Sequence, residues 1–197
     1  MATAVLAVQG AFAEHEAALA ALGETCLELR GPDDLARPFD RLVLPGGEST
    51  AQGKLLDELG MLGPLRERVA EGMPVLATCA GLILLARRVE GEGASGERAQ
   101  EGGHPIPRLA TLDATVRRNS YGRQLGSFHA QAELAGVGEV PMTFIRAPHV
   151  VEVGPGVEVL ARVDGRIVAV RQGSQLALAF HPELDGDPRV HELFLAL

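Results

Sequence analysis

Residues 75–86 read VLATCAGLILLA, one of the most apolar runs in the chain, with a cysteine and a glycine near its centre. Residues 74–78 fit a buried strand, and residues 80–88 fit a helix that starts directly after Cys79. A buried strand that leads straight into a helix is typical of parallel sheets covered by helices. The stretch therefore indicates the class of fold and leaves the role of Cys79, at the junction, to be decided.

The chain shows further strand and helix patterns on both sides of this stretch. Before it, the patterns predict strands at 3–9, 25–29 and 41–44 and helices at 12–22, 49–59 and 61–70. After it come β-like runs at 110–116, 127–134, 142–145, 157–163, 166–171 and 175–180 and a closing helix at 188–197. We predict an α/β fold: a doubly wound, mostly parallel sheet with helices on both faces and an antiparallel β extension.

Length and composition favour a single domain over residues 1–197, because a chain of 197 residues that is 46% hydrophobic can build one substantial core. Residues 91–103 read GEGASGERAQEGG and show no apolar periodicity. We therefore expect a flexible surface loop at 91–107 within that domain.

The formal net charge of −8, without any basic run, gives no reason to expect a nucleic-acid partner. No apolar run approaches the ~18 residues of a membrane span, and the N-terminal MATAVLAVQG lacks the basic start of a secretory signal. We therefore expect a cytoplasmic protein without a membrane partner. Two cysteines in such a protein do not predict a structural disulfide, and without paired Cys/His spacings we expect no metal site and no cofactor.

Three segments are expected at the carboxyl ends of strands, where doubly wound sheets bind their ligands. The first is Pro45-Gly46-Gly47, whose glycines let backbone N–H groups approach a ligand closely. Taken alone, this segment is better interpreted as a strand-to-helix turn with Ser49 or Thr50 as the helix N-cap.

Cys79 forms the second segment. A residue between a strand and a helix, with the small Ala77 and Gly81 two positions away on either side, fits a nucleophile elbow. A helix N-terminus also stabilises a thiolate. The alternative is a buried structural cysteine, which is common. Cys26 lies within an expected strand and without a following helix, so no reactive role is expected for it.

His181-Pro182-Glu183 is the third segment. In an extended chain, residues two apart point to the same side, so Glu183 could hold one ring nitrogen of His181 and leave the other free. The alternative is a solvated surface turn. The other histidines, His15, His104, His129, His149 and His191, show no such pattern and are not expected to be functional.

Together these segments supply a complete acyl-transfer site. Cys79 would be the nucleophile, His181 its base and Glu183 the group that orients the base. The backbone N–H groups of Gly47 and Ala80 could form the oxyanion hole. We therefore predict acyl transfer through a thioester.

The segments LPGGEST (44–50), TCAGLILLA (78–86) and FHPEL (180–184) resemble those of class I (triad) glutamine amidotransferases, which have a flavodoxin-like fold. More narrowly, the chain is similar over its whole length to the glutaminase subunits of pyridoxal 5′-phosphate synthases. The segments that carry this narrower resemblance are VQGA (8–11) with Glu14-His15, RNSYGRQ (118–124), FIRAPH (144–149) and GRIVA (165–169).

The resemblance implies that Cys79, His181 and Glu183 hydrolyse L-glutamine to L-glutamate and ammonia. It implies a glutamine pocket lined by Gly47, Glu48, Ser49, Arg118, Ile145 and Arg146. It also implies a partner, a separate synthase subunit that uses the ammonia to make pyridoxal 5′-phosphate. Three alternatives stay open: a glutaminase for another synthase, a γ-glutamyl hydrolase of the same fold, and a binding module whose triad is silent.

Overall fold

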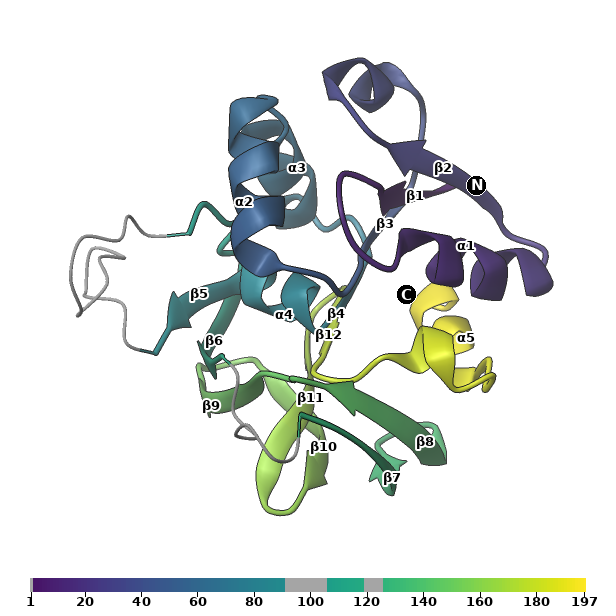
Figure 1. The fold of residues 1–197 in the computed structure, drawn as a ribbon, viewed down its shortest axis with the longest axis vertical. Helices are drawn as coiled ribbons and strands as arrows, with labels where there is room; N and C mark the ends of the chain where they lie inside the picture. Colours follow the sequence, from purple (N-terminus) through teal and green to yellow (C-terminus); the bar gives the residue numbers. More distant parts are fainter. Residues whose placement is uncertain (1, 91–105, 119–125) are drawn as a thin grey trace.

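The computed structural model describes residues 2–90, 106–118 and 126–197, and a ten-stranded sheet forms its centre (Figure 1). Five neighbouring strands of this sheet are parallel to one another. In spatial order they are β2 (Thr25–Leu29), β1 (Ala2–Leu6), β3 (Arg41–Leu44), β4 (Val75–Thr78) and β12 (Gln175–Leu178).

The sheet continues beyond β12 with mostly antiparallel pairs. The strands here are β11 (Arg166–Gln172), β9 (His149–Val153), β6 (Leu112–Arg117) and β5 (Ala86–Val89), with β10 (Glu158–Val163) paired to β11. Strands β7 (Ser127–Leu134) and β8 (Gly138–Ile145) form a separate antiparallel hairpin.

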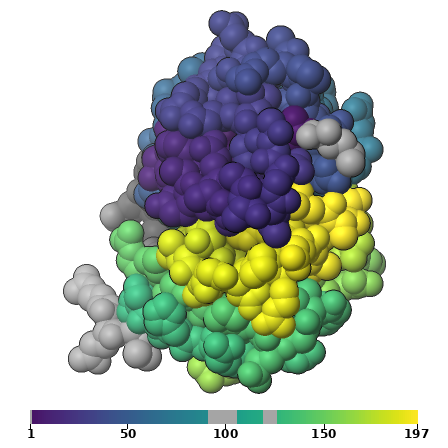
Figure 2. Space-filling model, turned by 90° about the vertical axis from the view of Figure 1, so that its right-hand side faces the viewer, coloured from purple at the N-terminus to yellow at the C-terminus, as the bar shows by residue number. Residues whose placement is uncertain are grey.

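Helices cover both faces of the parallel part (Figure 1). On one face lie α2 (Ser49–Glu58), α3 (Leu62–Ala70) and α4 (Ala80–Leu85); on the other lie α1 (Phe12–Ala21) and α5 (Arg189–Leu195). Figure 2 shows the purple N-terminal and yellow C-terminal segments packed side by side on this second face. Short 3-10 helices are η1 (Pro32–Ala36) and η2 (Pro182–Leu184). The predicted doubly wound α/β fold with an antiparallel extension is confirmed.

The central strands are apolar along their whole length because both of their faces are covered. All four residues of β4 are buried, and so are all four of β12. Leu44 of β3 is paired with Ala77 of β4, and Leu178 of β12 with Thr78, so these strands end side by side. Within 2–90, 106–118 and 126–197, no helix is both long and apolar enough to span a bilayer.

Several elements differ from the sequence prediction. β1 ends at Leu6 instead of residue 9, and β8 starts at Gly138 instead of residue 142. The helix predicted over 80–88 ends at Leu85, because Ala86–Val89 leaves it to pair as β5 with β6. Strand β9 was not predicted, and its place in the sheet comes from pairing with β6, far away in sequence. Residues 91–105 of the predicted loop 91–107 lie outside the described residues, while Ile106, near its end, is buried next to Gly53 of α2.

Candidate active site

Cys79 lies at a strained turn between β4 and α4. Its φ of 48° and ψ of −98° place a non-glycine residue in a left-handed region that side chains disfavour. The Cys79 N–H donates to the carbonyl of Leu178 at 2.8 Å, which ties the turn to β12. A Cβ atom on Gly81 would lie 2.1 Å from the Leu44 carbonyl oxygen, so the turn needs glycine there. The strand–turn–helix geometry expected for a nucleophile elbow is present.

His181 follows β12 and reaches the same edge of the sheet. Its N–H donates to the carbonyl of Thr143 at 2.8 Å, which fixes the backbone against β8. Its Nδ1 lies 2.7 Å from Oε1 of Glu183, and the Glu183 side chain is fully buried. The hydrogen bond expected between these two residues is therefore present in a dry environment, where it is strong.

The other ring nitrogen of His181 is available for chemistry. Nε2 is buried and has no hydrogen-bond partner among the described residues. Burial lowers the pKa of His181, but interactions with the Cys79 sulfur and the Glu183 carboxylate outweigh burial and raise the pKa to about 10. Burial would raise the pKa of Glu183, yet the hydrogen bond from His181 and the positive charge of that ring hold it below its usual range. The site thus favours a charged imidazolium beside an ionised carboxylate.

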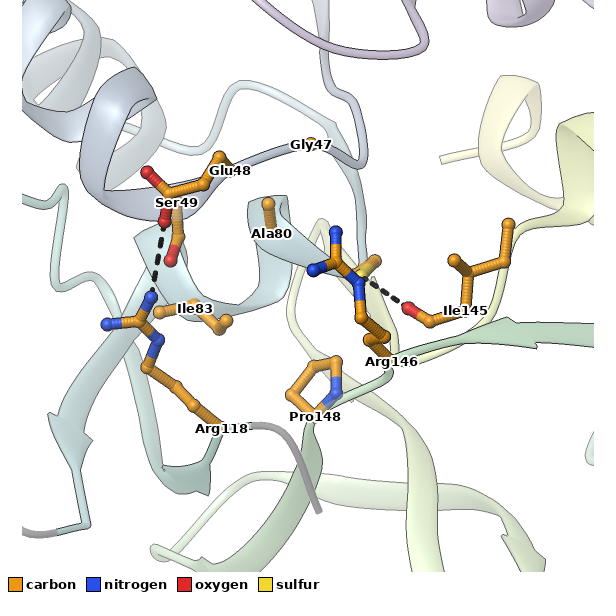
Figure 3. A pocket seen from close by; sticks show the side chains of 10 residues that line it. Gly47, Glu48, Ser49, Ala80, Ile83, Arg118, Ile145, Arg146 and Pro148 are labelled. Carbon is orange, nitrogen blue, oxygen red and sulfur yellow. Dashed lines mark hydrogen bonds and ion pairs between the residues drawn. The ribbon is translucent and has the colours of Figure 1, made fainter. Parts of the chain in front are cut away.

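The loop after β3 packs directly against His181. A Cβ atom on Gly46 would lie 2.3 Å from Cε1 of the His181 ring, so only glycine fits there. Gly47, the next residue, is exposed and lines the hollow around Cys79. Ala80, at the start of α4, lines the same hollow (Figure 3).

Two adjoining hollows, of about 140 Å³ and 270 Å³, surround Cys79. They share residues on both sides of the sulfur and therefore form one continuous depression. Every residue predicted for the glutamine pocket lines the smaller hollow, which lies between α4, the end of β8 and the start of α2 (Figure 3). Its lining is Gly47, Glu48, Ser49, Cys79, Ala80, Ile83, Arg118, Ile145, Arg146 and Pro148.

Glu48 and Arg118 form an ion pair at the rim, with Nη2 of Arg118 3.3 Å from Oε1 of Glu48 (Figure 3). Glu48 is also the N-cap of α2, because its carboxylate accepts from the N–H groups of Thr50 and Ala51 at 3.1 and 2.8 Å. The expectation of Ser49 or Thr50 as N-cap is therefore wrong. Burial would raise the pKa of Glu48, but these N–H groups and Arg118 hold it below its usual range. Residues 119–124 of the segment RNSYGRQ lie outside the described residues.

Cys26 lies within β2, away from this depression. Burial and the nearby Glu16 and Glu24 raise the pKa of its thiol to about 11, so a thiolate is disfavoured there. Among the described residues the two cysteines are both free thiols, and Cys79 alone lines the pocket.

Two residues that contact this site received no role from the sequence. Gln9 accepts the N–H of Glu48 on its Oε1 at 2.8 Å, which holds the loop that carries Gly47. His15 is fully buried behind the site, with Nε2 3.3 Å from Oε2 of Glu183. Sequence spacing could not indicate this contact, because His15 and Glu183 stand at opposite ends of the chain. Only the match of residues 8–11 and 14–15 to a family pattern pointed to this region.

The chain was compared with known proteins. Residues 5–197 match the family model described as the SNO glutamine amidotransferase family. The chain is 54% identical over 195 residues to the pyridoxal 5′-phosphate synthase subunit PdxT of Desulfitobacterium hafniense (strain Y51), covering 99% of this chain and 92% of the relative. It is 51% identical over 193 residues to the subunit of the same name from Methanocorpusculum labreanum, covering 98% and 95%.

Solved structures agree with these sequence matches. One described as a glutamine amidotransferase superposes with a TM-score of 0.89 at 44% identity, covering 100% of this chain and 98% of the other. A glutamine amidotransferase from Thermotoga maritima has a TM-score of 0.62 at 16% identity, covering 99% and 82%, and shares the fold. The family model spans nearly the whole chain, and several relatives are about half identical to it over their full length. The chain therefore belongs to the SNO glutamine amidotransferase family.

Proposed function

We propose that this chain is the glutaminase subunit of a pyridoxal 5′-phosphate synthase. It hydrolyses L-glutamine to L-glutamate and ammonia, and a separate synthase subunit consumes the ammonia to make pyridoxal 5′-phosphate. The observation that carries the proposal is that Cys79, on a strained elbow, lines the same hollow as His181. Nδ1 of His181 lies 2.7 Å from Oε1 of the buried Glu183. The similarity to PdxT subunits supplies the partner.

The first half of the reaction forms a thioester. The Cys79 thiolate attacks the side-chain amide carbon of glutamine, and the carbonyl oxygen becomes an oxyanion. The N–H groups of Gly47 and Ala80 donate to that oxyanion, and the position of Ala80 at the start of α4 adds the positive end of the helix. His181 gives its Nε2 proton to the amide nitrogen, the C–N bond breaks, and ammonia leaves.

The second half releases glutamate. Neutral His181 takes a proton from water at Nε2, and the hydroxide attacks the thioester carbon. The C–S bond breaks, glutamate is formed, and the imidazolium and thiolate return to their starting state. Glu183 keeps the His181 ring in place through both halves and stabilises its positive charge whenever the ring is protonated.

The charged ends of free glutamine fit the rim of the pocket. Arg118 can bind the α-carboxylate as a charge-assisted pair, and Glu48 can bind the α-ammonium group. The two side chains already pair with each other at 3.3 Å, so glutamine would exchange one ion pair for two. Ser49, Ile145 and Arg146 complete the lining around the substrate.

The ammonia requires an acceptor on another chain, and we place the complex in the cytoplasm, where thiols such as Cys79 stay reduced.

The test measures glutamate release from glutamine by this chain alone and after mixing with a candidate pyridoxal 5′-phosphate synthase subunit. We expect little release from the chain alone and a clear increase on mixing. Cys79→Ala should abolish release while leaving binding of the partner intact, because the thiol is the nucleophile.

Cys26→Ala is the matched control and should change release little, since Cys26 lies away from the pocket. Absence of glutamate release in both conditions would refute the glutaminase activity. Release that is equally fast with and without this partner would point to a hydrolase that works alone, or to a different synthase.

A further inference from the structure

A second histidine system lies directly behind the proposed triad and has no part in the mechanism above. His15 projects from α1 and is fully buried. Its Nε2 lies 3.3 Å from Oε2 of Glu183 and 3.1 Å from Oγ1 of Thr78, the residue before Cys79. Its Nδ1 lies 3.2 Å from Nε2 of His191, which is buried on α5. Glu183 thus has a histidine on both sides: His181 is hydrogen-bonded to Oε1, and His15 lies beside Oε2, which has no hydrogen-bond partner among the described residues.

The contacts assign one proton arrangement. Because the carboxylate beside it is negative, Nε2 of His15 carries the proton. Oγ1 of Thr78 accepts this proton at 3.1 Å, and the positive end of the N–H group lies beside Oε2 of Glu183. In neutral His15 the other nitrogen, Nδ1, is then an acceptor, and Nε2 of His191 donates to it. With the opposite tautomer, a lone pair of His15 would face the negative carboxylate, which is repulsive.

Both histidines are neutral near pH 7. The pKa of His15 is lowered to about 4, mainly by burial and also by His191 and His181. Glu183 and, more weakly, Glu14 oppose this lowering. Burial also lowers the pKa of His191, again against Glu183. A neutral N–H group beside the carboxylate stabilises its negative charge without neutralising it. The full negative charge of Glu183 therefore remains available to the imidazolium of His181.

We propose that His15 is a positioning residue that locks the Glu183 carboxylate against His181 and keeps it ionised, while His191 fixes the tautomer of His15. His15 touches no reacting atom and acts through Glu183. The inference rests on the proposed function for its purpose, but the coupling of His15 to His181 through Glu183 can be tested without substrate.

The test is the titration of the His181 ring followed by NMR in protein labelled at histidine, in the free chain. The groups that face His181 are Cys79, Glu183 and, through Glu183, His15. In His15→Leu, the Glu183 carboxylate loses the N–H dipole beside Oε2 and supports the imidazolium less. The midpoint of His181 should then fall by about one pH unit.

His15→Gln is the matched variant, because its amide N–H can reach the position of Nε2 and restore the donor. It should recover more than half of the lost shift. His15→Met also removes the donor, adapts to irregular space, and replaces His15→Leu if that variant does not fold. His149→Gln changes another buried histidine, on β9, and should leave the His181 midpoint unchanged.

An unchanged His181 midpoint in the variant without a donor would overturn the inference. An equal shift in the donor-free variant and in His15→Gln would overturn it too, because the effect would then come from packing. The readout needs neither glutamine nor a partner. A chain that releases no glutamate but shows the expected shifts would therefore refute the proposed function and leave the role of His15 standing.

Discussion

At the scale of single residues, the backbone of Cys79 is the clearest sign of function. A non-glycine residue at φ 48° and ψ −98° costs about 1–3 kcal/mol and persists only where the surroundings enforce it. Here the hydrogen bond to Leu178 and the close approach of Gly81 to Leu44 enforce it. The strain holds the sulfur at the mouth of the pocket instead of in the core.

This strain predicts an unusual order of stabilities. Cys79→Ala keeps a Cβ atom in the strained region, whereas Cys79→Gly removes it. Even after the larger loss of chain entropy for glycine, we expect Cys79→Gly to be more stable than Cys79→Ala by about 1 kcal/mol. Urea unfolding of both variants measures the difference. If the alanine variant proved the more stable of the two, the turn would not be strained as described.

At the scale of elements, the site depends on three connections that end at one edge of the sheet. The loops after β3, β4 and β12 bring together Gly46, Cys79 and His181, because the three strands are neighbours and parallel. The Gly46 backbone packs so closely against the His181 ring that a Cβ atom on Gly46 would overlap with Cε1.

Gly46→Ala should therefore displace His181 and lower the rate of glutamate release in the complex by on the order of a hundredfold. Gly63→Ala is the matched control. A Cβ atom on Gly63, exposed in α3, would meet nothing within 4 Å, so this change should leave the rate unchanged and stabilise the helix slightly. Equal rates in the two variants would show that the loop after β3 does not position His181.

The sequence predicted elements well where local patterns decide them. Strands 25–29, 41–44 and 127–134 agree with β2, β3 and β7, since each alternates or ends at a clear turn signal. The helix predicted over 80–88 is longer than the observed one, because the apolar run does not indicate that Ala86–Val89 pairs with β6. Strand β9 does have a local pattern, since HVVEV (149–153) is rich in valine and lies between Pro148 and Gly154, and the sequence prediction missed it.

The same contrast applies to the site. Cys79 and His181–Glu183 were predictable because an elbow and an extended His-x-Glu pair each have a local pattern. His15 was judged non-functional because its partners, Glu183 and His191, come from the other end of the chain. The contact between α1 and α5 forms only when the chain folds, so the spacing of residues in the sequence does not predict it.

At the scale of the whole molecule, strands from both ends of the chain share one sheet. β12 lies between β4 and β11, so the proposed nucleophile and its base come from neighbouring strands that are about a hundred residues apart in sequence. We propose that residues 1–197 form a single domain for this reason. Neither half of the chain could form the site without the other.

The central claim, a cysteinyl glutaminase, is tested most directly by labelling the complex of this chain and its synthase partner with a glutamine analogue that carries a diazoketone in place of the side-chain amide. Attack by a thiol forms a C–S bond and releases N₂, and mass spectrometry locates the adduct. The account predicts one adduct per chain, on Cys79, that excess glutamine prevents. An adduct on Cys26, or labelling of Cys79 that glutamine does not slow, would contradict it.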